Sequence, residues 1–128
     1  MEAKRYPYPP SHRIRTRPEF SAVFDARTRE SRGPVTVYAL PNALGHPRLG
    51  ISMSRKVGIA ARRNRIKRLL REAFRHHQYD WPRGYDIVIV PRPHAPFILA
   101  EYHKLLTALM LRLHHVWQRR AQPGDSPP

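Results

Sequence analysis

Residues 55–75 read RKVGIAARRNRIKRLLREAFR, a segment in which nine residues are arginine or lysine and only Glu72 is acidic. Apolar residues recur in it at i, i+3, i+4, i+7 and i+8: Ile66, Leu69, Leu70, Ala73 and Phe74. This spacing predicts a helix over residues 60–77 that packs one side on a core. So many like charges repel one another and disfavour the compact state unless a polyanion neutralises them. Nucleic acid is therefore the leading partner.

The side of this helix opposite the apolar stripe is a continuous polar ridge. At about 100° per residue, the residues on the ridge and its flanks are Asn64, Arg65, Lys67, Arg68, Arg71 and Arg75. Arg62 and Arg63 project closer to the apolar side, so we expect them where the helix overhangs the sheet or before it becomes regular. A charge run is usually a solvated face, but such a face mixes signs. We therefore expect the ridge to contact RNA or DNA.

The composition of the whole chain supports this interpretation. Its 128 residues include 24 Lys+Arg against 9 Asp+Glu, which gives a formal charge of +15 and a pI of about 11.4. The length suits a single domain. The absence of cysteine excludes disulfides and thiolate metal sites. No apolar run approaches the roughly 20 residues of a membrane span, and the N-terminus lacks a secretory signal, so we expect a cytoplasmic protein with no membrane partner.

The two ends of the chain are rich in proline. We expect residues 1–12 to form a flexible Pro-rich arm and residues 121–128 to form a disordered tail. Residues 13–120 then form the single domain.

Within this domain the sequence predicts helices and strands in alternation. Helical spacing predicts a short helix over residues 18–27 and a long one from Pro96 to about residue 117, besides the basic helix. Runs of β-branched and aromatic residues predict strands at 35–40, 48–54 and 85–90, the first two joined as a hairpin. This order gives an α/β or α+β layer with helices covering one sheet.

The loop from Ser52 through Ser54 to Gly58 carries hydroxyl groups and then two cations, Arg55 and Lys56, just before the basic helix. Such a loop can hold phosphate through its backbone N–H groups. An ordinary strand-to-helix turn, in which Gly58 supplies backbone freedom, explains the same residues equally well. Both interpretations stay open.

Phe20, Phe24 and Tyr38 form a set of rings on the first helix and first strand. Rings beside a sheet can stack unpaired bases, at roughly 1–3 kcal/mol per base. Taken alone, Phe20 and Phe24 are more often core residues. Tyr38 lies out of phase with the apolar residues of its strand, on the Thr36 face, so an open groove results if that face is not buried.

Residues for catalysis are scarce. The adjacent pairs His76-His77 and His114-His115 diverge by about 100° on a helix and seldom share one metal ion. The acidic residues are few and scattered and offer no paired-carboxylate pattern. No Gly-rich phosphate motif or triad signature is present. We therefore expect no catalytic residue and no metal site on this chain.

The motif at the basic helix is specific. Residues 62–68 (RRNRIKR), with SRKVG before them at 54–58 and LLREAFR after them at 69–75, closely resemble the signature of the bacterial ribonuclease P protein family. Phe20 and Phe24 resemble the N-terminal aromatic pair of that family.

The resemblance spans roughly residues 13–117. The strand ending at Tyr38 and the segment 49–52 fit the family's hairpin, and residues 86–92 fit its late strand. The departures are Arg55, where the family usually has lysine, and the proline-rich ends.

The resemblance implies an α/β domain, an α+β two-layer sandwich, with a mixed sheet of about four strands. It also implies a left-handed βαβ crossover as in ribosomal-protein-like domains, against the usual hand. In that family the RNA subunit cleaves the 5′ leader from precursor tRNA with bound Mg2+, and the protein is an accessory subunit. The partners implied are the catalytic RNA and the single-stranded leader, and we expect the free protein to be a monomer.

Carried over residue by residue, the family motif that meets the catalytic RNA and supports metal binding nearby falls on Arg63, Asn64, Arg65, Lys67 and Arg68. The family's leader groove falls on Phe20, Phe24 and Tyr38, and its phosphate-contacting cations on Lys56. With the other residues of the basic helix and its loop, the set expected to bind the RNA subunit is Arg55, Lys56, Arg62, Arg63, Asn64, Arg65, Lys67, Arg68, Arg71 and Arg75. The set expected to bind the leader is Phe20, Phe24, Thr36, Tyr38, Ser52, Ser54 and Lys56.

Two other functions compete with this one. A ribosomal-type structural RNA-binding protein has the same charge and layer, so composition does not separate it from a processing subunit. A self-sufficient nuclease is disfavoured by the scarcity of acidic residues.

Overall fold

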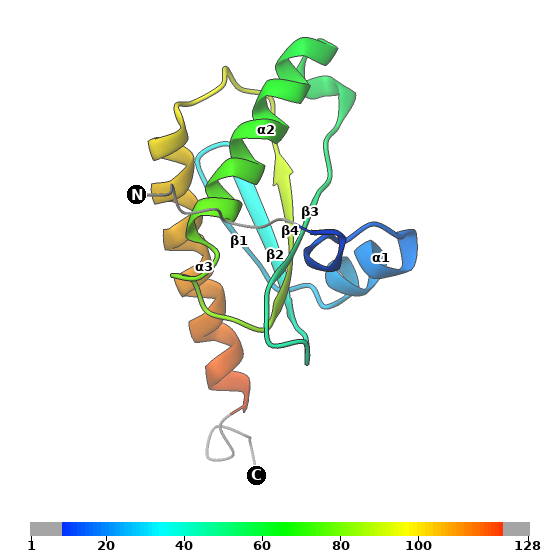
Figure 1. Ribbon diagram of the computed structural model, residues 1–128, viewed down its shortest axis with the longest axis vertical. Coiled ribbons are helices and arrows are strands. Elements are labelled where there is room, and N and C mark those ends of the chain that lie inside the picture. Colours follow the sequence, from blue (N-terminus) through cyan, green and yellow to red (C-terminus); the bar gives the residue numbers. More distant parts are fainter. Residues whose placement is uncertain (1–8, 122–128) are drawn as a thin grey trace, which may run out of the picture.

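The structure is a computed structural model that describes residues 9–121 (Figure 1). Its elements are α1 (Arg17–Asp25), β1 (Arg29–Arg32), β2 (Val35–Pro41), β3 (Arg48–Ile51), α2 (Ala60–His77), β4 (Tyr85–Pro91) and α3 (Leu99–Ala121). Short 3₁₀ turns precede α1 at Pro10–His12 and α2 at Arg55–Val57. Residues 1–8 of the expected arm and 122–128 of the expected tail lie outside the described residues.

The predicted helices are present, with small shifts at their ends. The basic helix has the predicted bounds. α1 ends two residues early, because Arg27 has a left-handed φ of 55° that no α-helix continues. α3 begins at Leu99 and not at Pro96. The Phe97 N–H donates to the Tyr102 hydroxyl (3.2 Å), and this hydrogen bond holds Phe97 in a non-helical segment before α3.

The sheet has four strands in the order β1-β2-β4-β3. β4 pairs antiparallel with β2 and parallel with β3, so the predicted hairpin of β2 with β3 is wrong. β4 separates the two because it is the most apolar strand, buried at six of seven positions, and takes a central place. β1 was not predicted, since its four residues, RESR, contain no apolar alternation.

The chain passes from β3 through α2 to the parallel strand β4. In Figure 1, α2 lies in front of the sheet and descends while both strands ascend, and β4 lies to the left of β3. The crossover is therefore left-handed, as expected from the resemblance and against the usual rule.

α2 and α3 cover one face of the sheet and enclose the main core. The sheet contributes alternate residues such as Val37, Leu49 and Ile87, and the helices contribute residues such as Phe74 and Leu109, all at most 1% exposed. The apolar stripe predicted for α2 packs on this face.

α1 packs on the opposite face, where Val23 meets Ile14 and the β4 residue Val88. Gly50 allows this approach, since a Cβ atom there would lie 2.8 Å from the Phe20 ring. α1 covers only part of this second face, and the uncovered part contributes to the site described next.

Candidate nucleic-acid interface

The polar ridge of α2 faces solvent. Its exposed residues are Asn64, Arg65, Arg68 and Arg71, and Lys67 on the flank is half-buried. The apolar side of the helix is buried, with Ile66, Leu70, Ala73 and Phe74 all at 0% exposure. The predicted division of the helix into a buried stripe and an exposed ridge is confirmed.

The first turns of α2 extend past the end of β4 (Figure 1). Burial on the helix begins only at Ile66, so Arg62 and Arg63 lie in the overhang, as predicted from their angular positions. The Arg62 stem folds back over Gly58, where a Cβ atom would meet its Cδ at 2.7 Å. The Nε of Arg63 is buried without a hydrogen-bond partner among the described residues.

The C-terminal end of the ridge is less positive than the sequence suggested. Glu72 binds Arg75 at 2.7 Å and His76 at 3.2 Å. The hydrogen bond from Arg75, aided by that from His76, lowers the pKa of the Glu72 carboxyl. Arg75 is thus half-buried and ion-paired, whereas Arg65, Arg68 and Arg71 form no ion pair within residues 9–121.

The loop before α2 is an ordinary turn in its backbone. The Ser54 side chain accepts from the Lys56 N–H at 3.1 Å, and the N–H groups of Val57 and Gly58 donate to the carbonyls of Ser54 and Arg55. These donors are used within the turn, so the phosphate-cradle interpretation is not supported. The side chains of Arg55 and Lys56 remain exposed beside the ridge.

Three shallow hollows follow α1 across the second face of the sheet. The first, about 350 Å³, has Arg71 of α2, Phe20 and the N-terminal residues Arg13 and Arg15 among its lining. The second, about 340 Å³, is lined by Arg17, Phe20, Phe24, Ile51 and Ser52. The third, also about 340 Å³, is lined by Phe24, Arg27, Arg29 and Tyr38. Neighbouring hollows share Phe20 or Phe24 in their lining, so the three follow one another along α1; together they are called here the α1 groove, whose first hollow includes Arg71 of the α2 ridge.

The rings of the α1 groove are half-buried. Phe24 and Tyr38 meet edge to face, with centroids 4.8 Å apart, and they pack with Phe20 on the small core of this face. The structure thus brings together Phe20, Phe24, Tyr38 and Ser52 from the predicted leader set. Thr36 is half-buried on the same face of β2, whereas Ser54 and Lys56 lie in the turn before α2 and line none of the three hollows.

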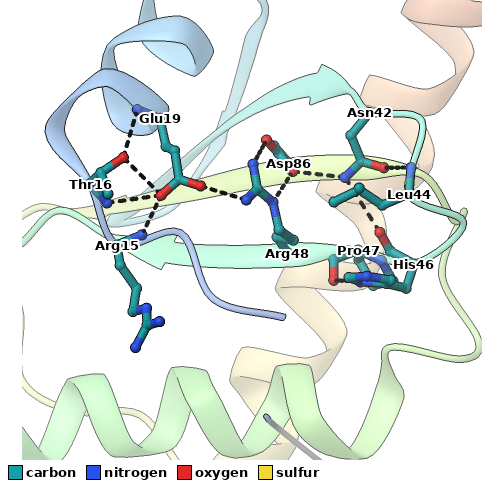
Figure 2. A network of polar contacts seen from close by, with 9 residues as sticks. All are labelled: Arg15, Thr16, Glu19, Asn42, Leu44, His46, Pro47, Arg48 and Asp86. Carbon is teal, nitrogen blue, oxygen red and sulfur yellow. Dashed lines mark hydrogen bonds and ion pairs between the residues drawn. The ribbon is translucent and has the colours of Figure 1, made fainter. Parts of the chain in front are cut away.

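A polar network fixes α1 to the sheet (Figure 2). Arg48 of β3 donates to Glu19 of α1 at 2.6 Å and to both carboxylate oxygens of Asp86 of β4 at 2.9 and 2.6 Å. Asn42 adds a 2.7 Å hydrogen bond to Asp86. One guanidinium therefore joins a helix and two strands, and it sets the position of the helix that carries Phe20 and Phe24.

Glu19 also caps its own helix. Its carboxylate accepts from the Thr16 and Arg15 N–H groups at 2.9 and 3.1 Å, and the Thr16 hydroxyl accepts from the Glu19 N–H. This reciprocal pair is a capping box. The backbone hydrogen bonds, with smaller help from Arg48, lower the pKa of Glu19 from 4.5 to about 2.

This shift predicts acid sensitivity. A carboxyl whose pKa falls on folding contributes stability that is fully present above pH 4.5 and is lost as the pH falls towards about 2. We expect the stability difference between the wild type and Glu19→Gln to shrink over that range, measured by urea unfolding at successive pH values. A difference that stays constant between pH 5 and pH 2 would contradict this assignment.

The family to which this architecture belongs is evident from comparison with known proteins. The family model described as Ribonuclease P matches residues 8–116. The chain belongs to the ribonuclease P protein family.

Individual members of the ribonuclease P protein family are similar over most of their length. The ribonuclease P protein component of Pseudomonas aeruginosa is 41% identical over 118 residues, covering 90% of this chain and 87% of that protein. The component of Desulfovibrio desulfuricans is 38% identical over 125 residues, covering 96% and 95%. Among solved structures, the RNase P protein of Thermotoga maritima has a TM-score of 0.71 and 32% identity, covering 78% of this chain and 96% of that one.

Some residues of the α1 groove were not predicted for this ribonuclease P family member. They are Arg13, Arg15 and Arg17 before and within α1, and Arg27 and Arg29 after it. The first three precede the apolar spacing of α1, and Arg29 lies on the unpredicted strand β1. The positive charge of these segments was the sequence feature that could have identified these residues.

Two negative findings concern the described part of this family member. Between residues 9 and 121, no helix combines the length and apolar character needed to cross a membrane. In the same range, no three His, Cys, Asp or Glu side chains gather in a way that could hold a metal ion.

Proposed function

We propose that this protein binds the catalytic RNA of ribonuclease P through the ridge of α2. The observation that carries the proposal is the exposure of Asn64, Arg65, Arg68 and Arg71 opposite a stripe that is buried at four of its five positions. Arg65, Arg68 and Arg71 lack acidic partners within the described residues, so each can neutralise a phosphate and release a counterion. Arg55 and Lys56 extend the same surface into the preceding turn.

The α1 groove is proposed to hold the single-stranded 5′ leader of precursor tRNA. Its half-buried rings supply stacking surfaces that tolerate any base, and its arginines supply charge. Such a site suits a strand whose sequence varies among substrates. Arg71 belongs to both the ridge and the groove, so the leader would leave the catalytic RNA directly into the groove.

Catalysis is proposed to lie with the RNA subunit and its Mg2+. In this proposal the protein contributes binding and electrostatics. The Asn64 amide and the ridge cations would order phosphates near the RNA's metal sites without ligating the ion themselves.

Reconstitution with the cognate RNA subunit tests the proposed function. At low Mg2+ we expect the protein to raise the rate of leader removal from precursor tRNA. Protein without RNA is expected to cleave nothing. If the protein gives no gain at any Mg2+ concentration and sediments instead with ribosomal subunits, a structural role on the ribosome would replace this proposal.

The leader site is tested by Phe24→Leu, which keeps an apolar side chain but removes the stacking surface. We expect precursor tRNA to bind the holoenzyme about tenfold more weakly, as for the loss of one stacked base, while mature tRNA binds unchanged. Phe97→Leu makes the same change at a half-buried ring packed on the main core and serves as the control. If Phe24→Leu and Phe97→Leu change the binding of precursor tRNA equally, and each changes the binding of mature tRNA by the same amount, the α1 groove is not the leader site.

A further inference from the structure

The strand β1 widens the face of the sheet that carries the α1 groove. In the β1–β2 register, Arg29 lies opposite Tyr38 and Ser31 lies opposite Thr36. Their side chains meet: Arg29 donates to the Tyr38 hydroxyl at 2.9 Å, and the hydroxyls of Ser31 and Thr36 are 2.7 Å apart. Residues 29 and 31 therefore belong to the groove face.

The alternate residues of β1 point to the other face. Glu30 pairs with Arg112 of α3 at 3.7 Å, and Arg32 lines a hollow with Glu101, Lys104 and Leu105 of the same helix. Two arginines of equal charge thus lie three residues apart on one strand and face opposite sides of the sheet.

The hollow at the β1 end of the α1 groove combines two rings with two exposed arginines. The Arg29 guanidinium carbon lies 5.8 Å from the centroid of the Tyr38 ring, which forms an edge-to-face pair with Phe24. Arg27 completes the lining. Both arginines are exposed, and neither forms an ion pair within residues 9–121. The volume, about 340 Å³, lies at the lower end of the roughly 300–1,000 Å³ seen for ligand pockets.

The backbone of Arg27 is unusual for an arginine. It follows α1 with a φ of 55°, and its N–H donates to the Phe24 carbonyl at 3.0 Å. Glycine is the common residue at such a helix end, because a side chain there is strained. In this protein the position keeps a long cationic side chain beside Phe24.

We propose that Arg27 and Arg29 form a phosphate-binding end of the α1 groove. It would receive the part of the leader farther from the cleavage site than the Phe24–Tyr38 ring pair. The α2 end of the groove faces the catalytic RNA in the proposed function, so a strand leaving that RNA reaches Phe20 and Phe24 before this hollow. A guanidinium beside two rings can grip a phosphate with two hydrogen bonds while the rings stack its base.

This inference rests on the proposed function, and leader length tests it. Holoenzymes reconstituted with wild-type, Arg29→Gln or Arg32→Gln protein would bind precursor tRNAs whose leaders grow one nucleotide at a time. We expect Arg29→Gln to lose about tenfold in affinity for long leaders, the size of one charge-assisted contact, and nothing for the shortest. Arg32→Gln removes the same charge from the other face of the strand and should follow the wild type at every length.

Arg27→Gly separates binding from stability. Glycine relieves the left-handed strain, so the thermal midpoint should stay level or rise while the affinity for long leaders falls severalfold. Damage to the fold cannot produce that combination. Arg27→Gly that binds long leaders as tightly as the wild type would remove Arg27 from the site.

The outcomes distinguish the two proposals. If Arg29→Gln and Arg32→Gln behave alike, or if Arg29→Gln lowers the affinity for short and long leaders equally, the proposal of a phosphate-binding end is wrong. If Phe24→Leu also has no selective effect on precursor tRNA, the failure lies with the leader groove itself.

Discussion

The double substitution Arg65→Ala with Arg68→Ala is expected to weaken binding of the protein to the ribonuclease P RNA about 100-fold or more. Each guanidinium is exposed on the α2 ridge and free of acidic partners within residues 9–121. A net contribution of about 1.5–3 kcal/mol for each charge-assisted contact gives this factor. The slope of log affinity against log salt should also shrink by about 2, since two fewer counterions are released. Filter binding over a series of salt concentrations measures both quantities.

A matched variant separates contact from net charge. Arg83→Ala with Arg119→Ala removes two exposed arginines from the β4 approach and from the end of α3, so the total charge falls equally. We expect a small loss that disappears at high salt. If both double variants lose the same affinity with the same salt slope, the α2 ridge is not the contact surface.

The second large effect is expected at Arg48. In Arg48→Met, Asp86, which is 7% exposed, keeps the Asn42 amide as its one side-chain partner among residues 9–121, and Glu19 loses its link to the sheet. Leaving a largely buried carboxylate without its cation costs about 3 kcal/mol. The thermal midpoint should fall by roughly 10 °C or more, and urea unfolding should show the corresponding loss of free energy.

Two further variants check that the loss comes from the unpaired charge. Arg112→Met breaks the ion pair with Glu30, in which the Arg112 side chain is 63% exposed, so we expect less than about 1 kcal/mol. Adding Asp86→Asn to Arg48→Met removes the uncompensated charge and should restore part of the stability. A double variant no more stable than Arg48→Met would assign the loss to packing.

The helices were predictable because their signals are local. The apolar spacing of α2 gives both its bounds and its exposed ridge, and Pro18 with the following apolar residues locates α1. The order of strands was not predictable in this way. Residues 35–40 and 48–54 are neighbours in sequence and read as a hairpin, yet β4, more than thirty residues farther on, lies between β2 and β3. Strand order depends on which strand is buried most completely, and that depends on contacts among strands that lie far apart in the sequence.

Only part of the site was predictable, because local sequence signals locate some of its residues whereas strand pairing locates the others. The residues of the ridge follow from helical spacing alone, and Tyr38 follows from its phase on β2. Arg29 could not be assigned, because its strand has no apolar pattern and its role depends on the register with Tyr38. The pairing of Arg75 with Glu72 was available from their separation of three residues but was outweighed by the charge of the surrounding segment.

The short outer strand also has a consequence for the protein before it meets RNA. An unpaired strand at the border of a sheet invites another chain to add to it, and this is a common route to aggregation. β1 has only four residues, and arginines project from both of its faces. On the far border, the Ile14 N–H donates to the Leu49 carbonyl at 2.9 Å, so the segment before α1 occupies the free side of β3. Both borders therefore resist intermolecular pairing, which keeps newly made protein available for assembly.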